Sequence, residues 1–143
     1  LAKAVMCKQF SDAHTSTFAQ ATAAAYLAAG GLPTALDKVR AVYASRAQAM
    51  CDALTKELGD TIEFVRPAGG LFVWATLTGA NGAIADGNAF AKRAIAHNVA
   101  FVPGAPFFAQ NPDLRTLRLS FATADIEKIE QGVRQLGHAM REA

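Results

Sequence analysis

Hydrophobic residues recur at steps of three and four along much of the chain, which is the period of an α-helix. This pattern predicts helices over residues 16–29, 34–58 and 86–97, and a last helix that follows Asp125. Gly30-Gly31 and Gly59 follow the first two helices, and glycine tolerates the left-handed conformation that ends a helix. The second helix is long enough to bridge two domains. Its apolar stripe consists of Leu36, Val39, Tyr43, Ala47, Met50, Leu54 and Leu58.

Between these helices the apolar pattern changes to that of β-strands, which are predicted over residues 61–66, 71–77, 99–102 and 116–121. The second of these is a nearly continuous apolar run, which predicts burial on both faces. The order is helix, helix, strand, strand, helix, strand, strand, helix. This order predicts a two-layer α/β fold in which a small mixed sheet carries its helices on one face.

The last strand carries an arginine in the run Leu117-Arg118-Leu119-Ser120-Phe121. Because side chains alternate along a strand, the two leucines and Phe121 share one face, and Arg118 lies on the opposite face. A guanidinium on a rigid element suits the recognition of a carboxylate or phosphate through two parallel hydrogen bonds. The alternative is an arginine on a solvated sheet face, since charged side chains are mostly exposed.

Composition narrows the classes of protein. With 143 residues, of which 52% are hydrophobic and 18% charged, the chain fits one folded domain with a substantial core rather than a disordered segment. The net charge of +2 is scattered and forms no basic stripe typical of nucleic-acid binding. The uncharged segment 15–36 is too poor in large aliphatic residues to span a membrane, and it predicts a helix buried against other protein.

No group of residues supplies a complete set of catalytic or metal-binding chemistry. His14, His97 and His138 lie on different predicted elements and share no metal-ligand spacing. Cys7 and Cys51 have no partner spacing for a disulfide or zinc site, which favours a reducing cytoplasm. The sequence therefore predicts no metal site and no catalytic residue within this chain.

Three motifs follow one another: Pro-Ala-Gly-Gly-Leu-Phe-Val-Trp at 67–74, Val-Ala-Phe-Val-Pro-Gly-Ala-Pro-Phe-Phe at 99–108, and Leu-Arg-Leu-Ser-Phe-Ala at 117–122. In order and spacing they resemble the C-terminal part of fold-type-I, pyridoxal-phosphate-dependent aminotransferases of class I/II. The nearest subgroup is that of 2-aminoadipate aminotransferase and GntR/MocR-linked enzymes. The resemblance covers essentially the whole chain. It implies a cytoplasmic homodimer that moves an amino group between an L-amino acid and a 2-oxo acid, with no nucleic-acid or membrane partner.

The resemblance also implies roles for individual residues. Arg118 would bind the substrate α-carboxylate, Gly70 would allow close approach of the backbone, and Phe72 with the turn 103–107 would form an apolar wall. Thr15 and Ser16 would reach across the dimer toward the phosphate of the partner's pyridoxal 5'-phosphate. The structural alternatives are a tight turn for Gly70, core packing for Phe72 and a helix N-cap for the hydroxyl residues.

One requirement of the family is absent. Transamination needs a lysine that forms a Schiff base with the cofactor, in a Ser-x-x-Lys-like motif. No such motif surrounds the lysines of this chain, which are Lys3, Lys8, Lys38, Lys56, Lys92 and Lys128. We therefore expect a C-terminal fragment that lacks the N-terminal large domain and is inactive alone. Residues 1–33 would be a remnant of that domain at the dimer interface, and residues 34–143 the small domain.

Two other classes of function stay open at this point. The chain could be a stand-alone α/β domain that binds a small ligand or regulatory effector at Arg118 without catalysis. It could also be a structural domain that contributes only an oligomer interface.

Overall fold

A computed structural model describes residues 1–142, and the chain divides into two compact units. The first unit spans Leu1–Arg40 and the second begins at Ala41. Helix α3 (Leu32–Leu58) starts in the first unit and continues into the second. It begins two residues before the predicted start of this helix at residue 34.

The first unit consists of α1 (Ala2–Asp12), α2 (Thr17–Ala28) and the beginning of α3. Neither α1 nor α2 buries a residue. Side chains as large as Phe10 and Phe18, each 83% exposed, lie open. Such surfaces are usually covered in an assembled protein. Within residues 1–142, no helix is both long and apolar enough to cross a membrane.

The second unit is built on a sheet of four strands: β1 (Ile62–Phe64), β2 (Phe72–Leu77), β3 (Val102–Pro103) and β4 (Thr116–Ser120). Their spatial order is β1-β2-β4-β3. The sequence predicts a mixed sheet, yet every strand pair in the described chain is antiparallel. The reason is topological, because β4 inserts between β2 and β3 and runs antiparallel to both.

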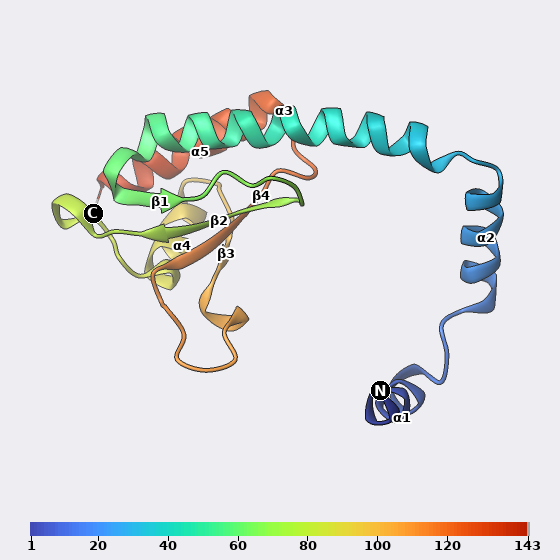
Figure 1. Ribbon diagram of the computed structural model, residues 1–143. Helices are drawn as coiled ribbons and strands as arrows, with labels where there is room; N and C mark the ends of the chain where they lie inside the picture. Colours follow the sequence, from blue (N-terminus) through green and yellow to red (C-terminus); the bar gives the residue numbers. More distant parts are fainter. Residues whose placement is uncertain (143) are drawn as a thin grey trace. The chain divides into compact units, whose positions relative to one another are not determined.

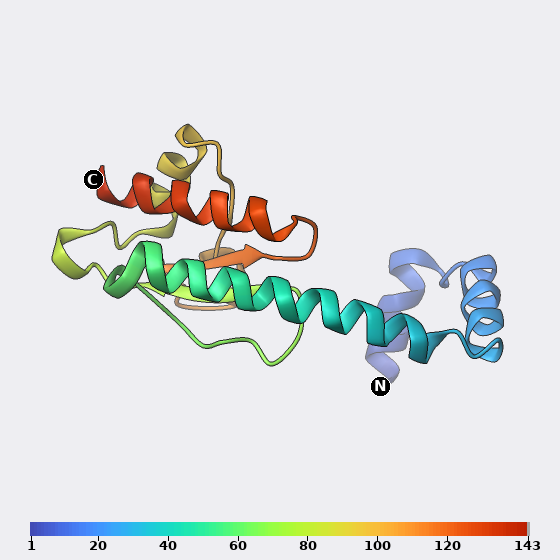
Figure 2. The same cartoon turned by 90° about the horizontal axis from the view of Figure 1, so that it is seen from above.

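Helices cover one face of this sheet (Figures 1 and 2). The part of α3 that leads into β1 runs beside α5 (Ile126–Arg141), and α4 (Gly87–Ala96) packs next to α5 and β3. All three helices share one hydrophobic core with the inward residues of the strands, among them Leu54, Phe90, Val73, Leu117 and Leu136, each 0–1% exposed. The predicted arrangement of helices on one face is confirmed.

The alternation predicted for β4 is confirmed. Leu117, Leu119 and Phe121 are buried in the core, whereas Arg118 is half-buried on the other face. The prediction that β2 is buried on both faces is wrong for this chain. Val73 and Leu77 are fully buried, but Phe72 and Trp74 are each 39% exposed, because no helix covers their side of the sheet.

Gly132 offers a test of the described helix packing. It lies inside α5, and an added Cβ would meet no heavy atom within 4 Å. Because alanine has a higher helix propensity than glycine, we expect Gly132→Ala to stabilise the second unit by roughly 0.5–1 kcal/mol. Urea denaturation followed by circular dichroism measures this change. Gly137→Ala in the same helix should not stabilise, since its Cβ would lie 3.1 Å from the carbonyl oxygen of Glu57. A loss of stability in Gly132→Ala would contradict the described packing.

Candidate functional site

Arg118 lies in the middle of β4, which has a partner strand on each side. It pairs with Trp74 of β2 and with Val102 of β3. Because both neighbours hydrogen-bond to β4, the backbone of Arg118 is fixed from two directions. Its side chain leaves the sheet on the face that the helices do not cover.

Aromatic rings surround the guanidinium. The central carbon of the Arg118 guanidinium lies 4.1 Å from the ring centroid of Phe72 and 4.5 Å from that of Phe107. Phe72 is on β2, and Phe107 closes the short 3-10 turn η3 (Ala105–Phe107) after β3. The ring of Trp74 packs edge-on against Phe107, with centroids 5.8 Å apart. The site is therefore a cation set in a partly exposed apolar surface.

The charge of Arg118 has no counterpart in the described chain. Within residues 1–142, no hydrogen bond or ion pair engages its guanidinium, and its Nε is buried without a partner. By contrast, Arg66 pairs with Asp52, and Arg115 pairs with Asp113 at 2.8 Å. An arginine on a merely solvated face would leave its nitrogens to water. A half-buried guanidinium that lies beside two aromatic rings and has no carboxylate partner in the described chain favours a site for an anion over a solvated arginine.

The glycine turn before β2 lies next to this surface in sequence. Gly70 has φ +84°, which favours glycine, and an added Cβ there would meet open space. Within the described chain, glycine is therefore needed at position 70 for its backbone conformation and not to avoid a steric clash. Just beyond the turn, the Leu71 carbonyl accepts a hydrogen bond of 3.1 Å from the Phe121 backbone N–H, which fixes the start of β2 beside the end of β4.

Thr15 and Ser16 belong to the first unit, and both are exposed. The Ser16 hydroxyl accepts a hydrogen bond of 3.4 Å from the Ala19 backbone N–H, so this serine is the N-cap of α2. The Thr15 carbonyl accepts hydrogen bonds of 2.9 Å from the side chain of Gln20 and, with Nδ1 in its protonated tautomer, of His14. The N-cap alternative for Ser16 is thus observed.

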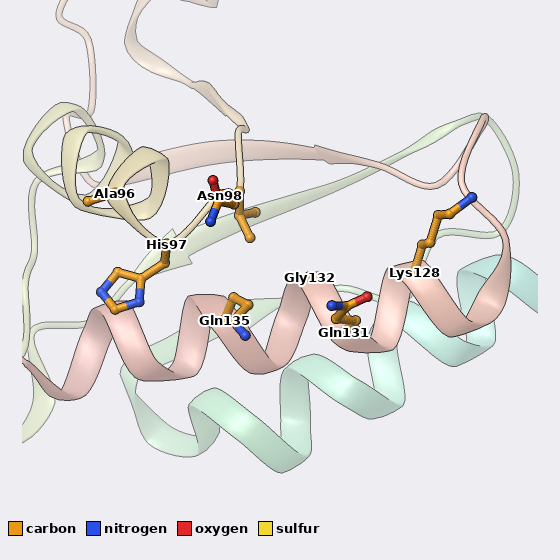
Figure 3. Close-up of a pocket in the computed structure, with 8 residues that line it drawn as sticks. Ala96, His97, Asn98, Lys128, Gln131, Gly132 and Gln135 are labelled. Atoms are coloured by element: carbon orange, nitrogen blue, oxygen red, sulfur yellow. The ribbon is translucent and has the colours of Figure 1, made fainter.

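A polar groove of about 400 Å³ lies away from Arg118, between the end of α4 and α5 (Figure 3). Its two ionisable side chains already have partners. His97 contacts Glu142 at 2.9 Å, and Lys128 pairs with Asp125 at 3.2 Å. Neither ionisable side chain of this groove is therefore unpaired, so the groove gives no evidence of a site for a charged ligand. Among the described residues, no cluster of three or more side chains suited to a metal ion occurs.

Three carboxyl groups at the protein surface have pKa values below the ordinary one. The hydrogen bond from Arg66 lowers the pKa of Asp52, and that from Arg115 lowers the pKa of Asp113. The backbone N–H of Lys128 lowers the pKa of Asp125 at the start of α5.

These pKa shifts predict an acid limit to stability. A carboxyl group with a lowered folded-state pKa stabilises the fold above its unfolded pKa of about 3.9. This contribution is lost as the pH falls through the lower folded-state pKa. We therefore expect the free energy of unfolding to decrease below about pH 4, and Asp52→Asn to show a shallower decrease. Urea denaturation between pH 2.5 and 7 measures both. A stability that is constant over this range would contradict the described ion pairs.

Sequence reasoning located Arg118, Phe72 and the turn that ends at Phe107, but it missed Trp74. The signal was present, since Phe72 and Trp74 are two residues apart and must share a face. The continuous apolar run concealed it, because the same run is typical of a strand that is buried on both sides.

Comparison with known proteins identifies relatives of the whole chain. Residues 3–136 match the family model described as aminotransferase class I and II. The 2-aminoadipate transaminase of Thermus thermophilus is 45% identical over 141 residues, which are 99% of this chain and 34% of that protein. Aromatic-amino-acid aminotransferase 1 of Thermococcus litoralis is 36% identical over 98% of this chain and 33% of its own length. The chain thus spans about a third of the curated relatives it matches.

Solved structures agree with these relatives. The α-aminoadipate aminotransferase LysN of Thermus thermophilus, complexed with N-(5'-phosphopyridoxyl)-L-leucine, superposes with a TM-score of 0.82 at 42% identity. That match covers 96% of this chain and 34% of the LysN chain. Kynurenine aminotransferase of Pyrococcus horikoshii, solved with PMP, superposes with a TM-score of 0.84 at 33% identity, over 96% and 33% of the two chains.

Proposed function

The chain belongs to the class I and II aminotransferase family, and we propose that it is the C-terminal part of a pyridoxal-phosphate-dependent aminotransferase. The parent enzyme would transfer an amino group between an L-amino acid and a 2-oxo acid. Arg118 would bind the α-carboxylate of both. The observation that supports this assignment is the half-buried guanidinium, which lies against the rings of Phe72 and Phe107 and has no carboxylate partner within residues 1–142.

The substrate site would use three residues of this chain. Arg118 would donate two parallel hydrogen bonds to the carboxylate, as a planar guanidinium does. Phe72 would exclude water from one side of this contact, which strengthens it. Gly70 would leave open space beside the start of β2, since an added Cβ meets no atom there. Together these residues would orient the amino acid without taking part in the bond changes.

The residues present fit only part of the cofactor. Thr15 and Ser16 lie at the N-terminus of α2, and a helix N-terminus suits a phosphate. We propose that they contact the phosphate of the cofactor bound by a second copy of the enzyme. All six lysines of the chain are exposed, and none lies in a Ser-x-x-Lys-like motif. When bound, pyridoxal phosphate would act as the electron sink, with its Schiff-base lysine contributed from outside these residues.

The arrangement of domains is part of the same proposal. Residues 1–33 would belong to the large domain and the dimer interface, and residues 34–143 to the small domain. Support comes from α1 and α2, which bury no residue in this chain although α2 contains no charged side chain. We propose that the missing part of the large domain and a second subunit cover these helices in a cytoplasmic homodimer.

An activity assay tests the proposal. The full-length protein, supplied with pyridoxal phosphate, should transfer the amino group of at least one proteinogenic amino acid to 2-oxoglutarate, with the parallel-line kinetics of a ping-pong reaction. The 143-residue chain alone should show no transfer. It should also gain no cofactor mass after borohydride reduction. Absence of transfer by the full-length protein across all amino acids, or transfer by the short chain, would contradict the proposal. The first of these results would favour a ligand-binding domain.

A further inference from the structure

The two rings beside Arg118 come from different parts of the chain. Phe72 is diagonal to Arg118 across the β2–β4 pair, since Phe72 pairs with Ser120 and Trp74 pairs with Arg118. Phe107 arrives from the turn after β3. Both ring centroids lie within 4.5 Å of the guanidinium carbon, inside the range of about 6 Å over which a ring attracts a cation. Two independent segments therefore converge on one charge.

The Phe107 ring is itself held in place. Trp74 contacts it edge-on, with an angle of 79° between the ring planes. The turn before it is fixed by a hydrogen bond of 2.7 Å from the Gly104 backbone N–H to the Thr116 carbonyl. Because Thr116 and Arg118 are on the same strand, β4 positions both the arginine and the turn that carries its aromatic neighbour.

We propose that Phe72 and Phe107 form a cation–π clamp that orients the Arg118 guanidinium before the substrate arrives. This inference rests on the proposed function and deepens it. A long arginine side chain loses conformational freedom when it binds, and a clamp removes part of that cost in advance. Because Nε is buried, a carboxylate that meets the clamped guanidinium contacts its two terminal nitrogens. Phe107 is thus a positioning residue, acting on the substrate through Arg118.

Fluorination of Phe107 tests the clamp, because fluorine withdraws charge from the ring face with little change of size. The full-length protein would carry 4-fluoro-, 3,5-difluoro- or 3,4,5-trifluorophenylalanine at position 107. The best amino acid substrate from the activity assay serves as the probe. We expect KM to rise stepwise with the number of fluorines, by roughly two- to tenfold in total, while kcat stays constant. A purely structural role would leave KM flat across the series.

The matched control is the same series at Phe108. This residue packs on Trp74 at 6.1 Å but is not over Arg118, so its fluorination should leave KM unchanged. Arg118→Gln distinguishes failure of the clamp from failure of the proposed function. A flat KM at position 107 with a strong effect of Arg118→Gln would overturn the clamp and leave the proposed function standing. No effect of Arg118→Gln would overturn the proposed function and the clamp together.

Discussion

Replacing Arg118 with glutamine is expected to lower kcat/KM of the full-length enzyme for its amino acid substrate at least tenfold. Loss of a charge-assisted contact costs roughly 1.5–3 kcal/mol, and each 1.4 kcal/mol corresponds to about a tenfold change. The contact should be strong here, because Phe72 and Phe107 lie within 4.5 Å and displace water from the guanidinium. Steady-state kinetics with the wild-type and variant proteins measure the effect.

Two further variants make this result specific. Arg118→Lys keeps the charge but loses the planar fork, so it should recover only part of the lost kcat/KM. Arg134→Gln removes an exposed arginine from α5, on the opposite side of the sheet, and should leave the kinetics unchanged. Wild-type kinetics for Arg118→Gln would show that this guanidinium does not bind substrate.

Introducing alanine at Gly104 is expected to destabilise the second unit by about 1–3 kcal/mol, or by more if the turn does not adjust. The new Cβ would lie 2.6 Å from the Cβ of Thr116 and 2.9 Å from its backbone carbon. These atoms cannot move away freely, because β4 is paired on both sides. The turn that carries Phe107 should therefore shift, and the aromatic contact with Arg118 should weaken as well. Thermal and urea denaturation measure the loss of stability.

Gly69→Ala is the matched control for this change. An added Cβ at Gly69 would meet no atom within 4 Å, and its backbone needs no left-handed conformation. We expect its stability to remain within about 0.5 kcal/mol of the wild type, as is usual for surface changes. Equal stabilities of Gly104→Ala and Gly69→Ala would contradict the close approach of the turn to Thr116.

The fold could be predicted where one strong local signal decides the structure. The alternation around Arg118 identified β4 and its two faces. The helical period after Asp125 identified α5, and the Asp125 carboxylate caps this helix by accepting a hydrogen bond from the Lys128 backbone N–H. Prediction failed where tertiary context decides. The apolar run of β2 does not reveal that helices cover only one of its faces. The insertion of β4 between β2 and β3 makes the sheet antiparallel, and no local sequence pattern indicates this strand order either.

The same division applies to the site. The strand period could place Arg118 on the polar face, and the resemblance of motifs suggested Phe72 and the turn ending at Phe107. The buried, unpaired Nε and the convergence of two rings on the guanidinium depend on the pairing of β3 with β4. Such long-range contacts have no signature in residue spacing. Trp74, which supports Phe107, does share the face of Phe72 by its spacing, but the continuous apolar run of β2 concealed that face.

Binding of the substrate α-carboxylate by Arg118 can be tested by measuring the affinity of the full-length enzyme for its amino acid substrate and for the corresponding amino acid amide, in the wild type and in Arg118→Gln. We predict that the substitution weakens binding of the amino acid at least tenfold and leaves binding of the uncharged amide nearly unchanged, because the lost partner is absent from the amide. An equal loss for both ligands, or no loss for either, would contradict the assignment of Arg118 to the α-carboxylate.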